Sequence, residues 1–129
     1  MSNVAKIAEI AVFLPLDYSL HYSVPEVLST RIKAGQRVIV PVGKRNLIGG
    51  LVLSTFSVIP RDLEIDPARL RPITALIDEV PILPEKMVPF IRWLSSYYFY
   101  PIGETVNTIL PYGLRVVTSI KLTVTEEGL

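Results

Sequence analysis

The 129-residue sequence contains no cysteine and only one histidine, His21. Without cysteine the chain can form neither a disulfide framework nor a thiolate metal site, and one histidine argues against a zinc site within it. No window of 18 uncharged apolar residues is present, and the N-terminus lacks the ordered regions of a signal peptide. We therefore expect a cytoplasmic protein with no membrane partner.

Acidic residues are missing from residues 27–61, which nevertheless contain six basic residues. The other 94 residues contain seven basic and twelve acidic residues, so a segment of charge +6 adjoins a remainder of charge −5. The whole-chain net charge of +1 hides this separation. Such a basic segment suits a phosphate or the end of a nucleic acid. Its basic residues are Arg31, Lys33, Arg37, Lys44, Arg45 and Arg61.

Half of the residues are hydrophobic, enough for a folded core, and eleven prolines lie mostly between apolar runs. This pattern predicts many short elements. Apolar runs and alternation predict strands over 5–12, 20–24, 36–40, 48–55 and 70–77. VGKRN predicts a hairpin turn, Pro41 an end to the third strand, and Pro72 an edge position for the fifth. Gly49-Gly50 predicts a bulge or a close backbone approach.

The sequence after residue 83 has the residue pattern of helices. Pro84 and Glu85 suit a first turn, after which apolar residues recur at helical spacing up to residue 98. A second, shorter helix is expected over residues 102–110 and a trailing strand over residues 116–124. We therefore predict an α+β fold, with a small sheet or barrel-like unit of about five short strands followed by two helices. The residues of the expected apolar helix face are Met87, Phe90, Ile91, Leu94, Tyr97 and Tyr98.

We find no catalytic constellation in the sequence, since phosphate-loop, nucleophile-elbow and cysteine-nucleophile motifs are all missing. Asp62, Glu64 and Asp66 could ligate a divalent ion, but a solvated acidic loop is the better interpretation. His21 alone is more often an ordinary half-buried residue than a functional one. Neither a catalytic residue nor a metal ligand is therefore assigned.

Two further features could contact nucleic acid. The turn Gly43-Lys44-Arg45 is balanced between solvated charge and a phosphate site, because its surroundings contain no acid. An aromatic row near the end of the first expected helix could stack on bases, although its spacing makes core packing the better account. The row consists of Trp93, Tyr97, Tyr98, Phe99 and Tyr100.

Four segments carry a family resemblance across most of residues 5–111. They are LPLDYSLHYSVPE (14–26), AGQRVIVPVGKRNLIGGLV (34–52), LRPITALIDEVPIL (70–83) and RWLSSYYFYPIGETVNTILP (92–111). In this order and spacing they resemble the N-terminal region of the primosomal replication-restart helicase PriA. That resemblance implies a compact mixed domain, not itself an enzyme, which captures the 3′ end of the nascent leading strand at stalled forks, without sequence preference.

The resemblance also implies a pocket for the DNA 3′ end, which falls on Leu20, His21, Gly43 and Arg71, with phosphate contacts from Lys44 and Arg45. Two positions depart from the family pattern. Leu20 replaces the usual Phe, which leaves an apolar platform with weaker stacking. His21 replaces the usual Asp, so an imidazole would accept the hydrogen bond from the 3′ hydroxyl.

The resemblance implies a domain organisation as well. We expect a 3′-end-binding domain over residues 1–115, with a β part over 1–80 and a helical part over 81–113. Residues 116–129 would begin a truncated winged-helix domain. The parent would be an ATP-dependent 3′–5′ DNA helicase that uses ATP with Mg²⁺ and contains zinc, whereas no cofactor is expected in this region.

The expected partners are single-stranded and forked DNA with a free 3′ end, the other domains of the parent helicase, replication-restart proteins and single-strand-binding protein. Two alternatives stay open. A protein-interaction domain would use the Tyr-rich helical face and would expose an apolar patch around Trp93 and Tyr97, whereas DNA binding requires a basic pocket around Gly43 and Arg71. An accessory domain of a tRNA-modifying formyltransferase is disfavoured by the segment PIGE and the trailing strand.

Overall fold

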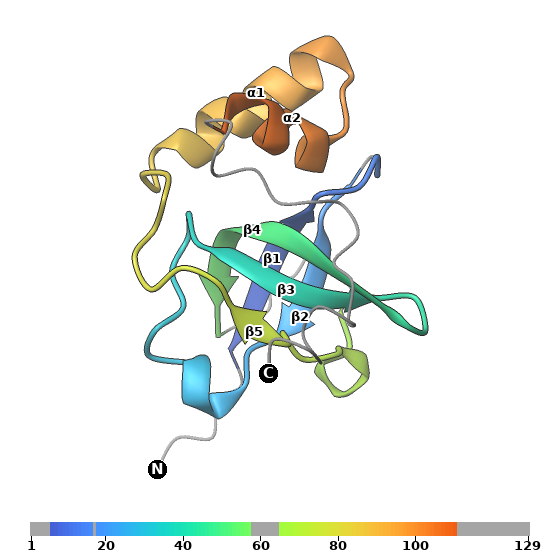
Figure 1. Cartoon of the computed structure of the whole chain (residues 1–129), viewed down its shortest axis with the longest axis vertical. Coiled ribbons are helices and arrows are strands. Elements are labelled where there is room, and N and C mark those ends of the chain that lie inside the picture. The colour runs from blue at the N-terminus through green and yellow to red at the C-terminus, as the bar shows by residue number, and fades with distance from the viewer. Residues whose placement is uncertain (1–5, 17, 58–64, 111–129) are drawn as a thin grey trace, which may run out of the picture.

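The computed structural model describes residues 6–16, 18–57 and 65–110, and it confirms the α+β class (Figure 1). The strands are β1 (Ile7–Val12), β2 (Leu20–Ser23), β3 (Arg37–Val42), β4 (Asn46–Phe56) and β5 (Ala75–Leu76). The helices are α1 (Met87–Tyr98) and α2 (Ile102–Ile109), with short 3-10 turns at Glu26–Leu28 and Pro67–Arg69. The expected trailing strand at 116–124 lies outside the described residues, and the division into domains stays a prediction.

The five strands form one antiparallel sheet in the order β2-β1-β4-β3-β5. The segment that leads into β5 also pairs with β2, at the other end of this order. The Ser23 amide donates to the Arg71 carbonyl at 2.9 Å, and the Ile73 amide donates to the Ser23 carbonyl at 3.0 Å. These bonds close the sheet into a small barrel, which satisfies backbone groups that an open edge would expose.

Two predicted strand boundaries are wrong, each for its own reason. Residues 70–77 form only the two-residue β5 and a bridge at Pro72, because this segment crosses from β2 to β3 instead of following one neighbour. Pro41 does not end β3, which continues to Val42. Pro41 pairs with Leu47, and its carbonyl accepts a hydrogen bond from the Tyr22 hydroxyl. A proline fits there because its missing N–H would point away from β4.

Gly50 shows the predicted close approach. A Cβ atom on Gly50 would lie 2.6 Å from Cγ2 of Ile10 and 3.0 Å from the Ala11 carbonyl oxygen, so β1 and β4 meet where no side chain fits. The bulge lies elsewhere. Register shifts from Glu9↔Ser54 to Ile10↔Val52, and Leu53 is therefore the extra residue of β4.

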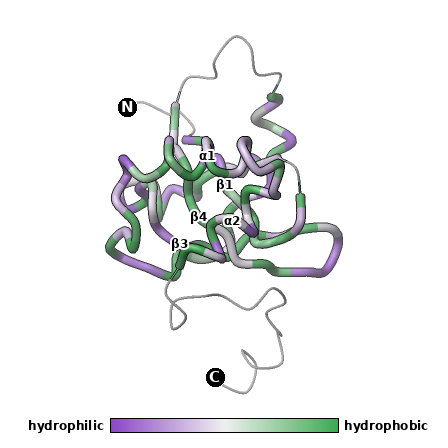
Figure 2. Tube along the Cα trace, turned by 90° about the horizontal axis from the view of Figure 1, so that it is seen from above, coloured by the Kyte–Doolittle hydropathy of each residue, from purple (hydrophilic) through white to green (hydrophobic). Residues whose placement is uncertain are grey.

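β1 and β4 are buried on both faces, and Figure 2 shows hydrophobic stretches along them near the helices. One face fills the barrel and the other packs against α1 and α2, so the fold contains two adjoining cores. Each fully buried aliphatic side chain contributes about 1.5–3 kcal/mol. The barrel core includes Ala8, Ile10, Val12, Tyr22, Val38, Val40 and Val52. The helix-side core includes Ala11, Phe13, Leu51, Leu53, Val88, Ile91, Val106 and Leu110.

α2 lies directly against the end of β1. A Cβ atom on Gly103 would lie 1.6 Å from the Val12 carbonyl oxygen, so the helix and strand backbones are in contact at this glycine. The segment PIGE therefore contains glycine for packing. Any side chain at residue 103 would push the helical layer away from the barrel.

The predicted apolar face of α1 is only partly correct. Ile91 is fully buried and Val88 nearly so, but Phe90, Trp93 and Tyr97 are 47%, 55% and 61% exposed. The preference for core packing of the aromatic row is therefore wrong. The apolar arc of α1 is wider than the surface that β1, β4 and α2 offer, so the aromatic rings beyond it pack on one another. Phe90 and Trp93 stack at 6.2 Å between ring centroids, and Trp93 and Tyr97 at 5.1 Å.

An ion pair ties α1 to the barrel. Arg92 on α1 donates to both carboxylate oxygens of Glu9 on β1, at 3.0 and 2.5 Å. The hydroxyls of Ser19 and Ser54 donate to the same carboxylate at 2.5 and 3.1 Å. Burial alone would raise the pKa of Glu9, but these hydrogen bonds and the charge of Arg92 outweigh it and lower the pKa from 4.5 to about 2.

We predict that this ion pair makes stability depend on pH. The carboxylate of Glu9 stabilises the fold fully above its ordinary pKa of 4.5, and this contribution is lost as pH falls towards 2. Glu9→Gln should therefore lower the free energy of unfolding by about 1–2 kcal/mol at pH 7, and by less as the pH falls. Urea unfolding at pH 7, 4 and 2.5 measures the difference. Arg92→Met removes the partner charge and should reduce the same dependence; an equal difference at all three values would contradict the assignment.

Candidate nucleic-acid interface

The β3–β4 hairpin turn is formed by Gly43, Lys44 and Arg45, because Val42 pairs with Asn46. Gly43 has a φ of +71°, in the left-handed region that favours glycine. A Cβ atom on Gly43 would meet nothing within 4 Å, so the space beside this backbone is open. Lys44 and Arg45 are exposed in the turn, as their sequence predicted.

All four residues predicted for a 3′-end pocket line one cavity of about 240 Å³. β2 contributes one wall, the hairpin a second, and the segment before β5 the third, so closure of the barrel brings the three together. Lys44 and Arg45 adjoin the cavity in the turn without lining it. The lining residues are Leu20, His21, Tyr22, Pro41, Val42, Gly43, Arg69, Leu70 and Arg71.

Arg71 joins two walls of the cavity. Its Nη1 donates to the Gly43 carbonyl at 2.5 Å, although 28 residues separate them in sequence. A guanidinium carries five N–H donors, so this bond fixes the group while leaving donors for an anion. The arrangement holds a positive charge at the open side of a glycine turn.

Tyr22 and Arg69 were not predicted as site residues. Tyr22 is buried, and its hydroxyl donates to the Pro41 carbonyl at 2.7 Å. Burial raises the pKa of Tyr22 to about 12, despite the opposing charge of Arg71, so the phenol stays protonated and forms a neutral floor. Alternation with Leu20 could have indicated that Tyr22 points inward, and the Arg69-Leu70-Arg71 pattern could have indicated a second cation.

His21 has a contact outside the cavity. Its ring lies 6.0 Å from the ring of Phe56 in an edge arrangement, and strand alternation places its side chain opposite those of Leu20 and Tyr22. His21 is opposite Glu9 in the β1–β2 register. It lines the cavity and also packs against the end of β4.

The acid-free segment is partly neutralised by residues far along the chain. Arg31 pairs with Glu79, and Arg37 pairs with Asp78 at 2.8 Å. Burial would raise the pKa of Asp78, but the hydrogen bonds and charge of Arg37 outweigh it and lower this pKa. Throughout 6–16, 18–57 and 65–110, no carboxylate forms an ion pair with the cations around the cavity. These cations are Lys44, Arg45, Arg69 and Arg71.

The described part of the chain shows no cluster of metal-ligating residues and no helix long and apolar enough to cross a membrane. Asp66 caps the turn that follows it, by accepting from the Ala68 amide at 3.1 Å. Asp62 and Glu64, the other members of the acidic loop, lie outside the described residues, as does Arg61.

The model of the PriA 3′ DNA-binding domain (3′BD) matches residues 9–111. The chain belongs to this family. Its predicted identity as a DNA-binding domain is therefore confirmed. The match covers both helices and all of the barrel except the first two residues of β1.

Curated relatives are PriA proteins of bacteria. "Replication restart protein PriA" of Chlamydia muridarum is 29% identical over 104 residues, 81% of this chain and 14% of the relative. The same protein of Chlamydia pneumoniae is 31% identical over 81% of the chain and 13% of the relative, and that of Bacillus subtilis 29% over 78% and 12%. The chain thus spans only 12–14% of the length of these relatives.

Proposed function

We propose that the cavity of about 240 Å³ receives the 3′-terminal nucleotide of a DNA strand, and that the chain thereby captures the nascent leading strand at stalled forks. One observation carries this proposal: Leu20, His21, Gly43 and Arg71, from three separate segments, line a single cavity. Family membership supports it, since the family is a 3′ DNA-binding domain.

A 3′ end differs from internal DNA in its free hydroxyl and in the absence of a further phosphate. A small cavity with a hydrogen-bond acceptor can read the first feature and exclude the second. In this assignment Leu20 supports the terminal base, the open side of Gly43 admits the sugar, and His21 accepts from the hydroxyl. The His21 ring also packs edge-on against Phe56, which holds it at the end of β4.

Arg71, Lys44 and Arg45 are assigned to the phosphates, with Arg69 added by the structure of the cavity rim. Phosphate contacts supply affinity without sequence information. Such tolerance suits a restart factor, because forks stall at any sequence.

In the proposed context, residues 1–115 form the 3′-end-binding domain of a longer ATP-dependent helicase that acts in the cytoplasm, and residues 116–129 begin its winged-helix domain. Its further partners would be the other helicase domains, replication-restart proteins and single-strand-binding protein. Support comes from the relatives, which carry the name replication restart protein and are several times longer.

The end-reading role of His21 predicts a specific effect of charge. His21→Asp should increase the preference for a 3′ hydroxyl over a 3′ phosphate by about 1 kcal/mol, roughly fivefold, because a carboxylate accepts the same bond and repels the phosphate. Titrations with thymidine oligonucleotides that differ only at the 3′ end measure it. His21→Asn, which adds no charge, is the matched control; an identical preference in all three proteins would remove His21 from the site.

The phosphate contacts predict a salt effect. Log affinity against log salt should fall with a slope of about −0.7 per phosphate neutralised on single strands, and Arg71→Ala or Lys44→Ala should each weaken binding by about 1 kcal/mol and flatten the slope. Lys33→Ala is the control, since Lys33 is exposed in the same basic segment but belongs neither to the cavity lining nor to the hairpin turn. Unchanged slopes in both Arg71→Ala and Lys44→Ala, with folding intact, would refute these contacts.

A protein-interaction surface is the second candidate function, and the exposure of Phe90, Trp93 and Tyr97 favours it. Trp93 is the one tryptophan of the chain, so its emission reports on this face. We expect single-stranded DNA to leave the emission unchanged, and a bound protein partner, such as single-strand-binding protein, to shift it to shorter wavelength by removing water. Quenching by DNA would assign the face to DNA instead; no shift with any proposed partner would remove the second candidate.

A further inference from the structure

Phe99, directly after α1, has an unfavourable backbone conformation and an exposed ring. Its φ of 54° and ψ of 41° make it the sole non-glycine residue with positive φ in the described ranges. Glycine usually fills this left-handed position at the end of a helix, since a Cβ atom is disfavoured there. The ring of Phe99 is 93% exposed, so packing does not compensate for the conformation.

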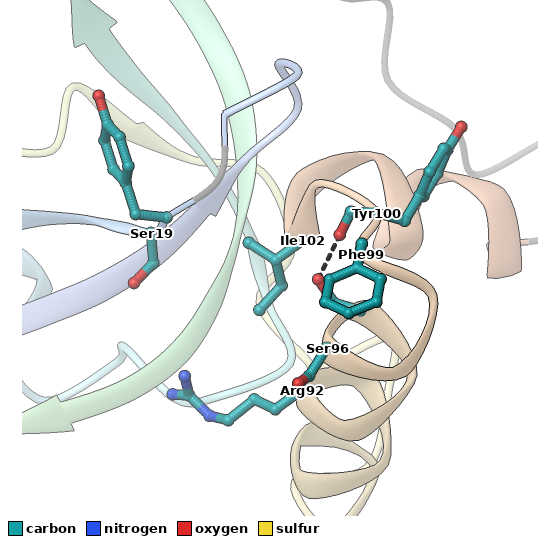
Figure 3. Close-up of a pocket in the computed structure, with 8 residues that line it drawn as sticks. Ser19, Arg92, Ser96, Phe99, Tyr100 and Ile102 are labelled. Atoms are coloured by element: carbon teal, nitrogen blue, oxygen red, sulfur yellow. Dashed lines mark hydrogen bonds between the residues drawn. The ribbon is translucent and has the colours of Figure 1, made fainter.

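The conformation is fixed on both sides. The Phe99 amide donates to the Ser96 carbonyl at 3.3 Å, and the Tyr100 amide donates to the Ser95 carbonyl at 2.9 Å. The Ser95 hydroxyl also donates to the Tyr100 carbonyl, the bond drawn as a dashed line in Figure 3. The ring is therefore presented to solvent from an ordered turn, as a preformed contact surface would be.

Phe99 lines a pocket of about 670 Å³ between the helices and the chain that leads into β2. Figure 3 shows Ser19 on the side of the sheet and Phe99 on the side of the helices, with Ile102 between them. The apolar side chains of Phe99 and Ile102 lie in this pocket beside several serine and tyrosine hydroxyls, a mixed surface on which a nucleobase can stack and form hydrogen bonds. The lining residues are Tyr18, Ser19, Arg92, Ser95, Ser96, Phe99, Tyr100 and Ile102.

One continuous stretch of chain, residues 18–22, contributes to both pockets. Tyr18 and Ser19 line the larger pocket, and the residues that follow at once, Leu20 and His21, line the smaller one. In the arrangement proposed below, the nucleotides that precede the terminal one follow this stretch from the smaller pocket to the larger one.

The charge of the larger pocket favours a base over a phosphate. Among the described residues, Arg92 is the one basic residue that lines this pocket. Its guanidinium already donates hydrogen bonds to both carboxylate oxygens of Glu9. A base stacked on an aromatic ring needs no net charge, and every base offers a π-face, so such contacts tolerate any sequence.

We propose that this larger pocket stacks bases of the same DNA strand upstream of its 3′ end, with the Phe99 ring as the stacking platform. This inference rests on the proposed function, because it takes the strand direction from the 3′-end cavity. The row Phe90, Trp93 and Tyr97 is not assigned this role, since each of those rings already stacks on a neighbouring ring and none of them lines the pocket.

Phe99→Gly tests the inference directly, because glycine removes the ring and adopts the left-handed conformation without steric cost. We expect a melting temperature equal to or above that of the wild type. Affinity for a thymidine 10-mer should fall about tenfold or more, whereas affinity for a thymidine dinucleotide with a free 3′ hydroxyl should not change. Calorimetric titration of the 10-mer and NMR shift titration of the dinucleotide give these values.

Trp93→Ala is the matched control, an exposed aromatic on α1 that does not line the pocket, and it should bind both oligonucleotides as the wild type does. A 10-mer bound equally by wild type and Phe99→Gly would overturn the inference, and a 3′-hydroxyl preference in the same titrations would then leave the proposed function standing. Loss of 10-mer affinity without any end preference would support stacking and remove the 3′-end cavity. A melting temperature below wild type would overturn the view that Phe99 is held in an unfavourable conformation.

Discussion

Closure of the barrel through residues 71–73 is the constraint on which the site depends. Two hydrogen bonds link Ser23 on the edge strand β2 to the segment that leads into the other edge strand, β5. These bonds bring Arg71 beside β2. The same closure lets Arg71 reach the carbonyl of Gly43. If the sheet were open, the hairpin turn, the start of β2 and the cation would belong to separate surfaces, and no cavity would form between them.

Local patterns predicted much of this fold. Propensity and turn chemistry describe features that depend on neighbours in sequence. Such features here are the hairpin around Gly43, the helix start near Pro84 and the strands predicted over 20–24 and 36–40. The short β5 could not be found in this way, because residues 70–77 pair with two different strands and continue along neither. Burial of the aromatic row was mispredicted for a related reason: spacing shows an apolar arc, but the width of the surface that covers it is a tertiary property.

The basic segment of the sequence is less positive in the folded structure than its composition suggests. The Arg37–Asp78 pair shows that an acid-free segment can be neutralised by a distant one. What remains positive, around Arg71 and the hairpin turn, is smaller than the sequence suggested and better localised. The charge of the hairpin turn drew attention to Gly43, Lys44 and Arg45, but Leu20, His21 and Arg71 came from the family resemblance, since neither composition nor periodicity links them to this turn.

The backbone contact between Gly103 and Val12 fixes the position of α2 against the end of β1. Because the two backbones are in direct contact there, the helical layer lies close against the barrel, and the stretch from Tyr18 to Tyr22 contributes to both pockets. The separation of a terminal-nucleotide site and a base-stacking site would therefore be set by main-chain geometry. With one strand bound at both proposed sites, the length of DNA covered from its 3′ end would be constant, whatever its sequence.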